Sequence, residues 1–295
     1  MSALFIQRVA ALALIAVAAC DRSSKRPVAS ITDDFGDTIR IGATPSRIVS
    51  LNPATTEMLF AMGAGARLVG RTHWDLYPDS ARLVPDLGTG IRPNVEAVLG
   101  SRPDLVVLYA SADNRTAALQ LRKAGVNTVS LKIDLIRDFE RAARILGLVL
   151  RDSARARVVS DSVLRTLDRV RAATRDLPRP TVFWHIWDAP LITIGRGSYM
   201  NELIDIAGGR NVYGDVDVPS PPVSIEDVLR RDPHYIITGP EGATKIRADK
   251  RWAAAPAVRA GRVLVVDTAV VGRPAVRLGE AAVALARALH PDTIR

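Results

Sequence analysis

The hydrophobic residues of this chain fall into short apolar runs separated by segments with helical spacing. The clearest runs lie at 47–51, 68–70, 105–108, 126–131, 181–184, 235–238 and 262–266, with a shorter one at 39–41. Continuous apolar runs are typical of strands that helices cover on both faces, as in parallel sheets. Helical patterns separate the runs, one of them at 55–62 after a capping threonine. The pattern predicts an α/β fold with largely parallel sheets.

The middle of the chain has a different pattern. Residues 136–174 contain no strand-like run, and apolar residues recur there every three or four positions. This spacing predicts a long helix, with a possible break at 147–152, that ends before Leu177-Pro178. We therefore expect an N-terminal α/β lobe at 39–135, a connecting helix at 136–178 and a C-terminal α/β lobe at 179–295.

An internal repeat indicates that the two lobes are related. Residues 94–107 and 224–237 share a glutamate, a Val-Leu pair, a proline and a closing apolar pair at equal offsets. Each copy predicts a capped short helix, a proline that ends it and a buried strand. Glu96 and Glu226 occupy the same first-turn position in their respective copies.

The N-terminus has the pattern of an export signal. Arg8 precedes an unbroken apolar run from Val9 to Ala19, and the only cysteine of the chain, Cys20, follows directly. An apolar run this short after a basic residue predicts a signal peptide at 1–19 rather than a membrane-spanning helix. Residues 17–20, Val-Ala-Ala-Cys, resemble a bacterial lipobox, which makes Cys20 the predicted lipidation site. The alternative is a plain signal peptide with an incidental cysteine. Residues 20–38 are then expected to form a lipid-anchored tether.

The charge distribution and the motifs indicate which classes of protein this chain does not resemble. The formal net charge is +9, but the arginines are scattered among acidic residues, as at 137–141, so no nucleic-acid partner is expected. There is no G-x-S-x-G, P-loop or G-x-G-x-x-G motif, and the four histidines are far apart in the sequence. We therefore expect a binding protein with no catalytic residues and no metal-ion site of its own. A surface-anchored hydrolase or scaffold is the more distant alternative.

Several segments, taken in order, resemble the periplasmic binding proteins for cobalamin, iron-siderophores and haem. They are residues 47–57, Val69-Gly70 leading to Tyr77-Pro78, 94–96 with 102–106, 207–209 and 224–226. The resemblance covers about Ile31 to the C-terminus. It implies two Rossmann-like lobes joined by one long rigid helix, with a ligand cleft between the lobes.

Within that family the cobalamin-binding members are the most similar. Residues 70–78 look like the aromatic loop of their first lobe, which makes His73, Trp74 and Tyr77 predicted ligand-binding residues. Residues 184–187 lie where the second lobe faces the cleft, and they add Trp184, His185 and Trp187. Trp184 and Trp187 cannot lie on one face of a strand, so one of them is expected to line the site. Asn52, which closes the first clear strand, completes the predicted set.

The resemblance also implies partners and a location. It predicts an ABC permease dimer with its ATPase subunits, a small-molecule ligand, and attachment to the membrane at the periplasmic or outer surface through Cys20. Glu96 and Glu226 are predicted to dock the two lobes on arginines of the permease; the alternative is that each only complements a helix dipole. No cofactor is expected. An iron-siderophore or haem is the alternative ligand, and His73 and His185 would be the histidines available to a cobalt or iron centre.

Overall fold

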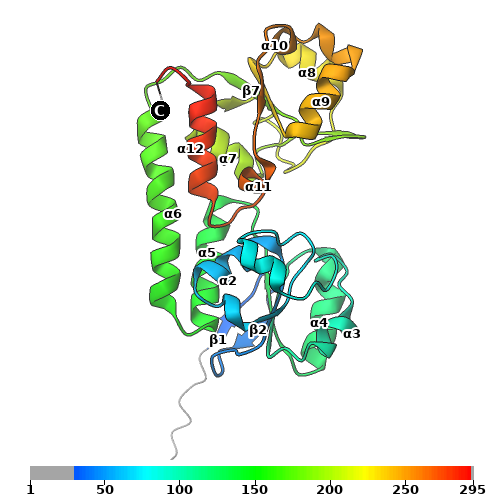
Figure 1. Ribbon diagram of the computed structural model, residues 1–295, viewed down its shortest axis with the longest axis vertical. Coiled ribbons are helices and arrows are strands. Elements are labelled where there is room, and N and C mark those ends of the chain that lie inside the picture. Colours follow the sequence, from blue (N-terminus) through cyan, green and yellow to red (C-terminus); the bar gives the residue numbers. More distant parts are fainter. Residues whose placement is uncertain (1–29, 294–295) are drawn as a thin grey trace, which may run out of the picture.

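The computed structural model describes residues 30–293, which form two α/β lobes beside a layer of helices (Figure 1). The predicted signal peptide, Cys20 and residues 20–29 of the predicted tether lie outside the described residues. The two lobes confirm the predicted α/β fold class. Each lobe is built around a four-stranded parallel sheet.

The sheet of the N-terminal lobe has the strand order β4-β3-β5-β6. Every neighbouring pair is parallel, and β3 pairs with β5 from Ile48↔Leu105 to Leu51↔Leu108. The apolar runs form these strands because helices cover both faces of the sheet and the strand side chains are almost all buried. The strands are β3 (Ile48–Leu51), β4 (Leu68–Gly70), β5 (Leu105–Tyr109) and β6 (Asn127–Leu131), and the helices of this lobe are α2 (Pro53–Ala61), α3 (Val95–Gly100) and α4 (Arg115–Lys123).

The sheet of the C-terminal lobe has the order β10-β7-β11-β12 and is also parallel. Its strands are β7 (Thr181–Trp184), β10 (Arg210–Asn211), β11 (Tyr235–Thr238) and β12 (Val263–Val265). A two-stranded antiparallel sheet of β8 (Trp187–Asp188) and β9 (Leu191–Ile192) follows β7. The helices are α7 (Tyr199–Ile206), α8 (Ile225–Arg231), α9 (Pro240–Ala248), α10 (Pro256–Arg259) and α11 (Thr268–Val271).

The sequence repeat occupies equivalent places in the two lobes. Its first copy forms α3 and β5, and its second copy forms α8 and β11. β5 and β11 are each the third strand of their sheet in the orders given above. The repeat therefore reflects a shared supersecondary unit.

The connector predicted at 136–178 as one long helix is a pair of helices, and they separate within the possible break predicted at 147–152. α5 (Ile136–Val149) and α6 (Ser153–Thr174) are joined by three residues, so the chain reverses direction there. The Asp152 side chain caps α6 by accepting a hydrogen bond from the Arg155 N–H. A Cβ at Gly147 would lie 2.5 Å from the Ala156 Cβ, so glycine allows the two helices to pack closely. Only α6, which packs against α12 (Leu278–Leu289), runs alongside both lobes (Figure 1).

A β-hairpin occupies part of the segment predicted to be tether. β1 (Ser30–Thr32) pairs antiparallel with β2 (Thr38–Arg40). Between them the buried Asp33 carboxylate accepts hydrogen bonds from the N–H groups of Phe35, Asp37 and Ser130, each at 3.0 Å, and pairs with Arg122 of α4. Residues 30–38 are therefore part of the N-terminal lobe.

Candidate ligand-binding site

The aromatic residues predicted to bind ligand lie at the carboxyl ends of the two parallel sheets. The loop after β4 carries Trp74 and Tyr77, and the segment after β7 carries Trp187. Open α/β sheets bind ligands outside the carboxyl ends of their strands, because loops and helix N-termini converge there. The loop after β4 contacts the segment between α11 and α12, which follows β12 in the chain, so loops beyond the carboxyl ends of the two sheets meet at the lobe boundary.

Two arginines make this contact across the lobe boundary. The Arg273 guanidinium donates a hydrogen bond to the Trp74 carbonyl oxygen. The Arg277 guanidinium lies over the Tyr77 ring, 4.6 Å from its centroid. The C-terminal lobe therefore holds the aromatic loop of the N-terminal lobe directly.

The loop that carries Trp74 has an exposed ring on a fixed backbone. Trp74 is 58% exposed, and the His73 ring lies against it with 4.5 Å between centroids. Directly after it, the buried Asp75 carboxylate accepts hydrogen bonds from the Thr72 N–H (3.1 Å), the Thr72 hydroxyl (2.7 Å) and the Thr56 hydroxyl (2.7 Å). Because these hydrogen bonds fix the loop backbone, the exposed Trp74 ring forms a rigid apolar wall, and the loop loses little conformational entropy when a ligand binds.

The second lobe presents Trp187 in a comparable way. Trp187 is 58% exposed on β8, and the Lys245 ammonium lies 5.9 Å from its ring centroid. Lys245 also binds the Asp188 carboxylate at 2.8 Å, and the other oxygen of Asp188 lies 2.9 Å from Nε2 of His185. This His185–Asp188–Lys245 network ties the Trp187 hairpin to α9.

Trp184 and His185 do not line a site in the way the sequence predicts. Trp184 is 2% exposed and packs in the hydrophobic core, so Trp187 is the exposed member of the pair. His185 is buried, and its Nδ1 lies 3.0 Å from the Thr238 hydroxyl while Nε2 contacts Asp188. Burial lowers the pKa of His185, although Asp188 opposes this effect. With both ring nitrogens hydrogen-bonded, His185 positions Asp188 and is not free to bind a metal centre.

Asn52 has a structural role at the start of α2. Its side-chain oxygen accepts a hydrogen bond from the Ala54 N–H at 3.0 Å, and its carbonyl oxygen accepts one from the Thr55 hydroxyl at 2.9 Å. The residue is 8% exposed. Asn52 is the N-cap of the helix.

Glu57 is a boundary residue that sequence analysis did not single out for the site. It lies on α2 with 3% of its surface exposed, and burial raises its pKa from 4.5 to about 7. Arg273 and Arg277 lower that pKa, whereas Asp75 and Glu280 raise it. No local pattern predicts this cluster, because the two arginines are more than 200 residues from Glu57 in the sequence.

Glu96 and Glu226 are exposed in the first turns of α3 and α8. Asn94 accepts a hydrogen bond from the Ala97 N–H, and Ser224 accepts one from the Asp227 N–H, so the two helices begin alike. α3 and α8 lie on the side of the molecule away from α6 (Figure 1). The pair thus presents one acidic residue per lobe on one side of the molecule.

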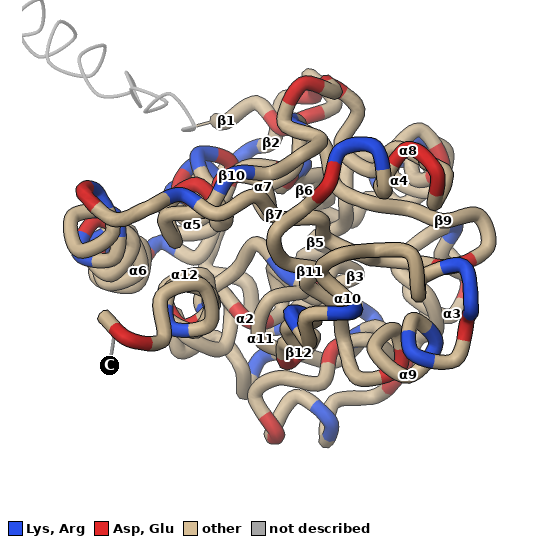
Figure 2. The backbone as a smooth tube through the Cα atoms, turned by 90° about the horizontal axis from the view of Figure 1, so that it is seen from above, with Lys and Arg blue, Asp and Glu red and all other residues tan. Residues whose placement is uncertain are grey.

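Charged residues of both signs are interspersed around the molecule (Figure 2). Many arginines are paired, as Arg251 is with Asp249 at 2.7 Å and Arg92 with Asp113 at 2.7 Å. Within residues 30–293, no group of three or more histidine, cysteine or acidic side chains is arranged to hold a metal ion. The same part of the chain contains no helix long and apolar enough to cross a membrane.

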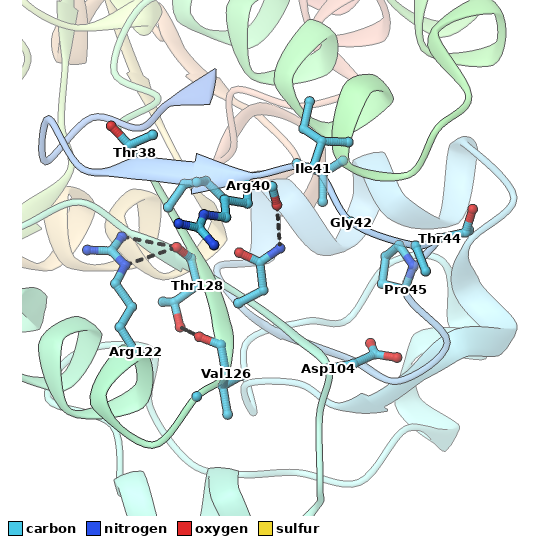
Figure 3. Close-up of a pocket in the computed structure, with 15 residues that line it drawn as sticks. Thr38, Arg40, Ile41, Gly42, Thr44, Pro45, Asp104, Arg122, Val126 and Thr128 are labelled. Carbon is cyan, nitrogen blue, oxygen red and sulfur yellow. Dashed lines mark hydrogen bonds between the residues drawn. The ribbon is translucent and has the colours of Figure 1, made fainter. Parts of the chain in front are cut away.

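Two cavities lie in different parts of the molecule. One of about 580 Å³ lies beside the Trp187 hairpin and is lined in part by Asp188, Lys245 and Trp252. Another of about 690 Å³, shown in Figure 3, lies between β2 and the start of β6, next to Asp104 and Arg122. This second cavity is at the amino ends of the N-lobe strands, on the edge of the sheet opposite the aromatic loop. The first cavity is lined by residues of the C-terminal lobe, and Glu226 is one of them.

A family model, two relatives and a solved structure that match this chain are all named as binding proteins. A family model described as "Periplasmic binding protein" matches residues 48–270. A relative from Halobacterium salinarum named cobalamin-binding protein is 29% identical over 297 residues, covering 93% of this chain and 77% of its own. An uncharacterised ABC transporter substrate-binding lipoprotein of Bacillus subtilis is 26% identical over 278 residues, covering 90% and 87%. The crystal structure of a periplasmic heme binding protein from Pseudomonas aeruginosa has a TM-score of 0.76 at 26% identity, covering 84% and 94%.

Proposed function

This chain belongs to the periplasmic binding protein family, and we propose that it captures a corrinoid for an ABC importer. Membership of this family makes the chain a solute-binding protein of the ABC-importer type. The observation that carries the corrinoid proposal is the pair of exposed tryptophans, Trp74 and Trp187, one on each lobe and each following the carboxyl end of a parallel strand. A corrinoid is a large ring with broad apolar faces, and flat aromatic walls on fixed backbones suit such a ligand. The cobalamin-binding relative, which matches 93% of this chain, supports the same ligand.

Haem is the second candidate, and a specific observation favours it. Arg273 and Arg277 lie at the lobe boundary beside the aromatic loop, where guanidinium groups suit the carboxylates of a haem or siderophore. The structural similarity to a heme binding protein agrees with this alternative. However, Arg277 is paired with Glu280 at 2.7 Å, and Arg273 already binds the Trp74 carbonyl. The corrinoid is therefore our first choice.

Visible absorption and native mass spectrometry of the protein as purified test the choice of ligand. We expect corrinoid absorption bands and a mass increase equal to one corrinoid when the protein is produced in cells supplied with cobalamin. A Soret band with the mass of haem, or the mass of a ferric siderophore, would instead favour the second candidate.

We further propose that Cys20 anchors the protein to a membrane by lipidation. The support is the lipobox-like sequence before Cys20 and the relative named as a lipoprotein. Produced with its own N-terminus in a bacterium, the protein should lack residues 1–19 and partition into detergent, and Cys20→Ser should abolish that partition. Retention of Met1 in a soluble cytoplasmic protein would contradict the proposal.

The docking role of Glu96 and Glu226 is part of the same proposal. Both side chains are exposed at equivalent first-turn positions, one on each lobe. Two acidic residues that meet arginines on a two-subunit permease would fix the orientation of the binding protein over the translocation path. Charge pairs of this kind mainly set orientation and association rate.

A further inference from the structure

A basic residue precedes each strand of the N-terminal sheet. Arg47 and Arg67 come directly before β3 and β4. Arg102 and Lys123 come shortly before β5 and β6. Because the four strands are parallel, these residues lie along one edge of the sheet, at its amino ends. This edge is at the end of the N-terminal lobe that points away from the C-terminal lobe, where Figure 1 shows β1 and β2.

Hydrogen bonds join two further segments to this edge. The Asn127 side chain, at the start of β6, donates to the Arg40 carbonyl oxygen at 3.4 Å. The Arg151 guanidinium donates to the Gly42 carbonyl oxygen at 3.0 Å, which brings the start of α6 next to the segment before β3. We call the whole set the basic edge, and it consists of Arg40, Arg47, Arg67, Arg102, Lys123, Arg151 and Arg155. The same segments contain two acids, Asp104 and Asp152.

The cations of the basic edge have no acidic partner in the part of the chain that the structure describes. Within residues 30–293, none of the seven lies within ion-pair distance of a carboxylate. The corresponding edge of the C-terminal lobe differs, because Arg179 before β7 pairs with Asp205, and Arg231 before β11 pairs with Asp215 at 2.8 Å. Cations at the amino ends of strands are therefore not left unpaired as a rule in this protein.

Helix stability does not account for the whole set. Helices of the lobe end at this edge, and cations near a helix C-terminus complement its dipole. This explains Lys123, which lies in the last turn of α4. It does not explain Arg155, which lies in the first turn of α6, where a cation opposes the dipole. It does not explain Arg40 either, which ends a strand.

The seven cations also differ in their contacts. Three of them hold neighbouring loops, because their guanidinium groups donate to backbone carbonyl oxygens: Arg47, Arg67 and Arg151. The other four are exposed, and their side chains make no hydrogen bond or ion pair within residues 30–293: Arg40, Arg102, Lys123 and Arg155. These four charges are available to a partner outside the chain.

The chain enters the fold at the same edge. Ser30, the first residue that the structure describes, pairs with Arg40 across the hairpin. Cys20 lies ten positions earlier, and ten residues reach at most about 35 Å. Residues 21–29 add three basic residues and one acid. A lipid anchor at Cys20 therefore keeps the basic edge near the membrane surface.

We propose that the basic edge is a docking surface for anionic phospholipid headgroups and that it holds the N-terminal lobe against the membrane. A negatively charged lipid surface attracts clustered lysine and arginine side chains, and it supplies the opposite charge that the described residues do not. The candidate ligand site lies at the carboxyl edge of the same sheet, so docking leaves that site open. The lipid anchor, which belongs to the proposed function, decides only which surface is near.

The cavity shown in Figure 3 opens on this edge but suits a phosphate group poorly. Its Arg122 is already paired with Asp33 and Asp37, and Asp104 contributes a carboxylate to its lining. The exposed cations around the cavity are therefore the expected contact with the headgroups.

Flotation with lipid vesicles tests the proposal. The chain is produced from residue 20 onward with Cys20→Ser, which keeps both lobes complete and carries no lipid. We expect it to bind vesicles that contain phosphatidylglycerol, to leave pure phosphatidylcholine vesicles unbound, and to be released as salt is raised. One cation near an anionic surface changes binding about fivefold, so removing four should weaken binding about a hundredfold or more. The edge variant combines Arg40→Gln, Arg102→Gln, Lys123→Gln and Arg155→Gln, whose side chains make no contact that the fold needs.

The matched control removes the same residue types from the other end of the molecule. It combines Arg175→Gln, Arg210→Gln, Arg247→Gln and Lys250→Gln, all exposed and without a side-chain hydrogen bond or ion pair within residues 30–293. This control variant should keep most of the binding. An equal loss in both variants would mean that only net charge matters and would overturn the proposal. Failure of the unchanged chain to bind phosphatidylglycerol vesicles, or binding to duplex DNA without binding to vesicles, would overturn it too.

Lysine acetylation reports the orientation of the bound protein. Lys123 is on the basic edge and Lys250 is in the C-terminal lobe, and both are exposed. Vesicles should protect Lys123 from acetylation and leave Lys250 reactive, as peptide mass spectrometry measures; equal protection of the two would contradict docking through this edge. Because the tested chain has no lipid, its result is independent of the detergent partition that tests the anchor at Cys20.

Discussion

Removing the Trp74 ring should weaken ligand binding by a predictable amount. A tryptophan buries up to about 250 Å² of surface, and Trp74 is 58% exposed, so about 150 Å² is available to a ligand. A flat ligand covers one face of the ring, or about half of that area. At about 25 cal/mol per Å² this contact contributes about 2 kcal/mol, which is about thirtyfold in Kd. Trp187, with the same exposed fraction, should behave alike.

The assay is titration of purified apo-protein with cobalamin, followed by quenching of tryptophan emission and by calorimetry. Trp74→Ala and Trp187→Ala should each raise Kd about thirtyfold, and Trp74→Phe should recover part of the loss. Leu83→Ala is the matched control, because Leu83 is 86% exposed in the same lobe but lies outside the aromatic loop. If cobalamin binds and both alanine variants keep the original Kd with an intact fold, the tryptophans are not the walls of the site.

Three more predictions follow from other parts of the molecule. Asp33→Ala should lower the free energy of unfolding by about 3–5 kcal/mol in chemical denaturation, because it leaves three backbone N–H groups without their buried acceptor, whereas Arg122 keeps its ion pair with Asp37; a loss below 1 kcal/mol would mean that the hairpin is dispensable. Burial raises the pKa of Glu57 from 4.5 to about 7, so the folded state retains a proton that the unfolded state has lost, and stability falls as pH rises through this window. Glu57→Gln should therefore remove up to about 3 kcal/mol of that fall between pH 4 and pH 8, and unfolding curves with the same pH dependence in both proteins would contradict this. Glu96→Ala with Glu226→Ala should leave ligand affinity unchanged and reduce uptake in a reconstituted transporter, most strongly at low salt, where charge pairs are least screened; normal uptake by the double variant would leave both residues as helix-dipole partners only.

The strands were largely predictable from the sequence, because the sheets are buried on both faces. Runs such as 68–70, 181–184 and 235–238 match β4, β7 and β11 residue for residue. The two-residue strands β8 and β10 are too short to carry a hydrophobic pattern, so their existence depends on the tertiary fold. The hairpin at 30–40 was missed for a related reason. Its polar residues carry no strand pattern in the sequence, and the hairpin depends on the ion pair between Asp33 and Arg122, which lie 89 residues apart.

The candidate site was only partly predictable. Alternation along a strand indicated that one of Trp184 and Trp187 would be exposed, but not which one, since that depends on where β7 ends. The turn after Val149 was also uncertain, because helical spacing continues on both sides of residues 150–152. The contact between Arg273 and Trp74 joins residues 199 positions apart, and no local pattern can indicate it.

The measurement that tests the central claim most directly is calorimetric titration of the apo-protein with cobalamin and, separately, with haem, with each ligand recovered afterwards and analysed by mass spectrometry. We predict that one cobalamin binds per chain, that haem binds more weakly, and that the ligand is recovered chemically unchanged. Tight stoichiometric binding of haem with no binding of cobalamin would contradict the corrinoid proposal, and recovery of a converted ligand would contradict a purely solute-binding role.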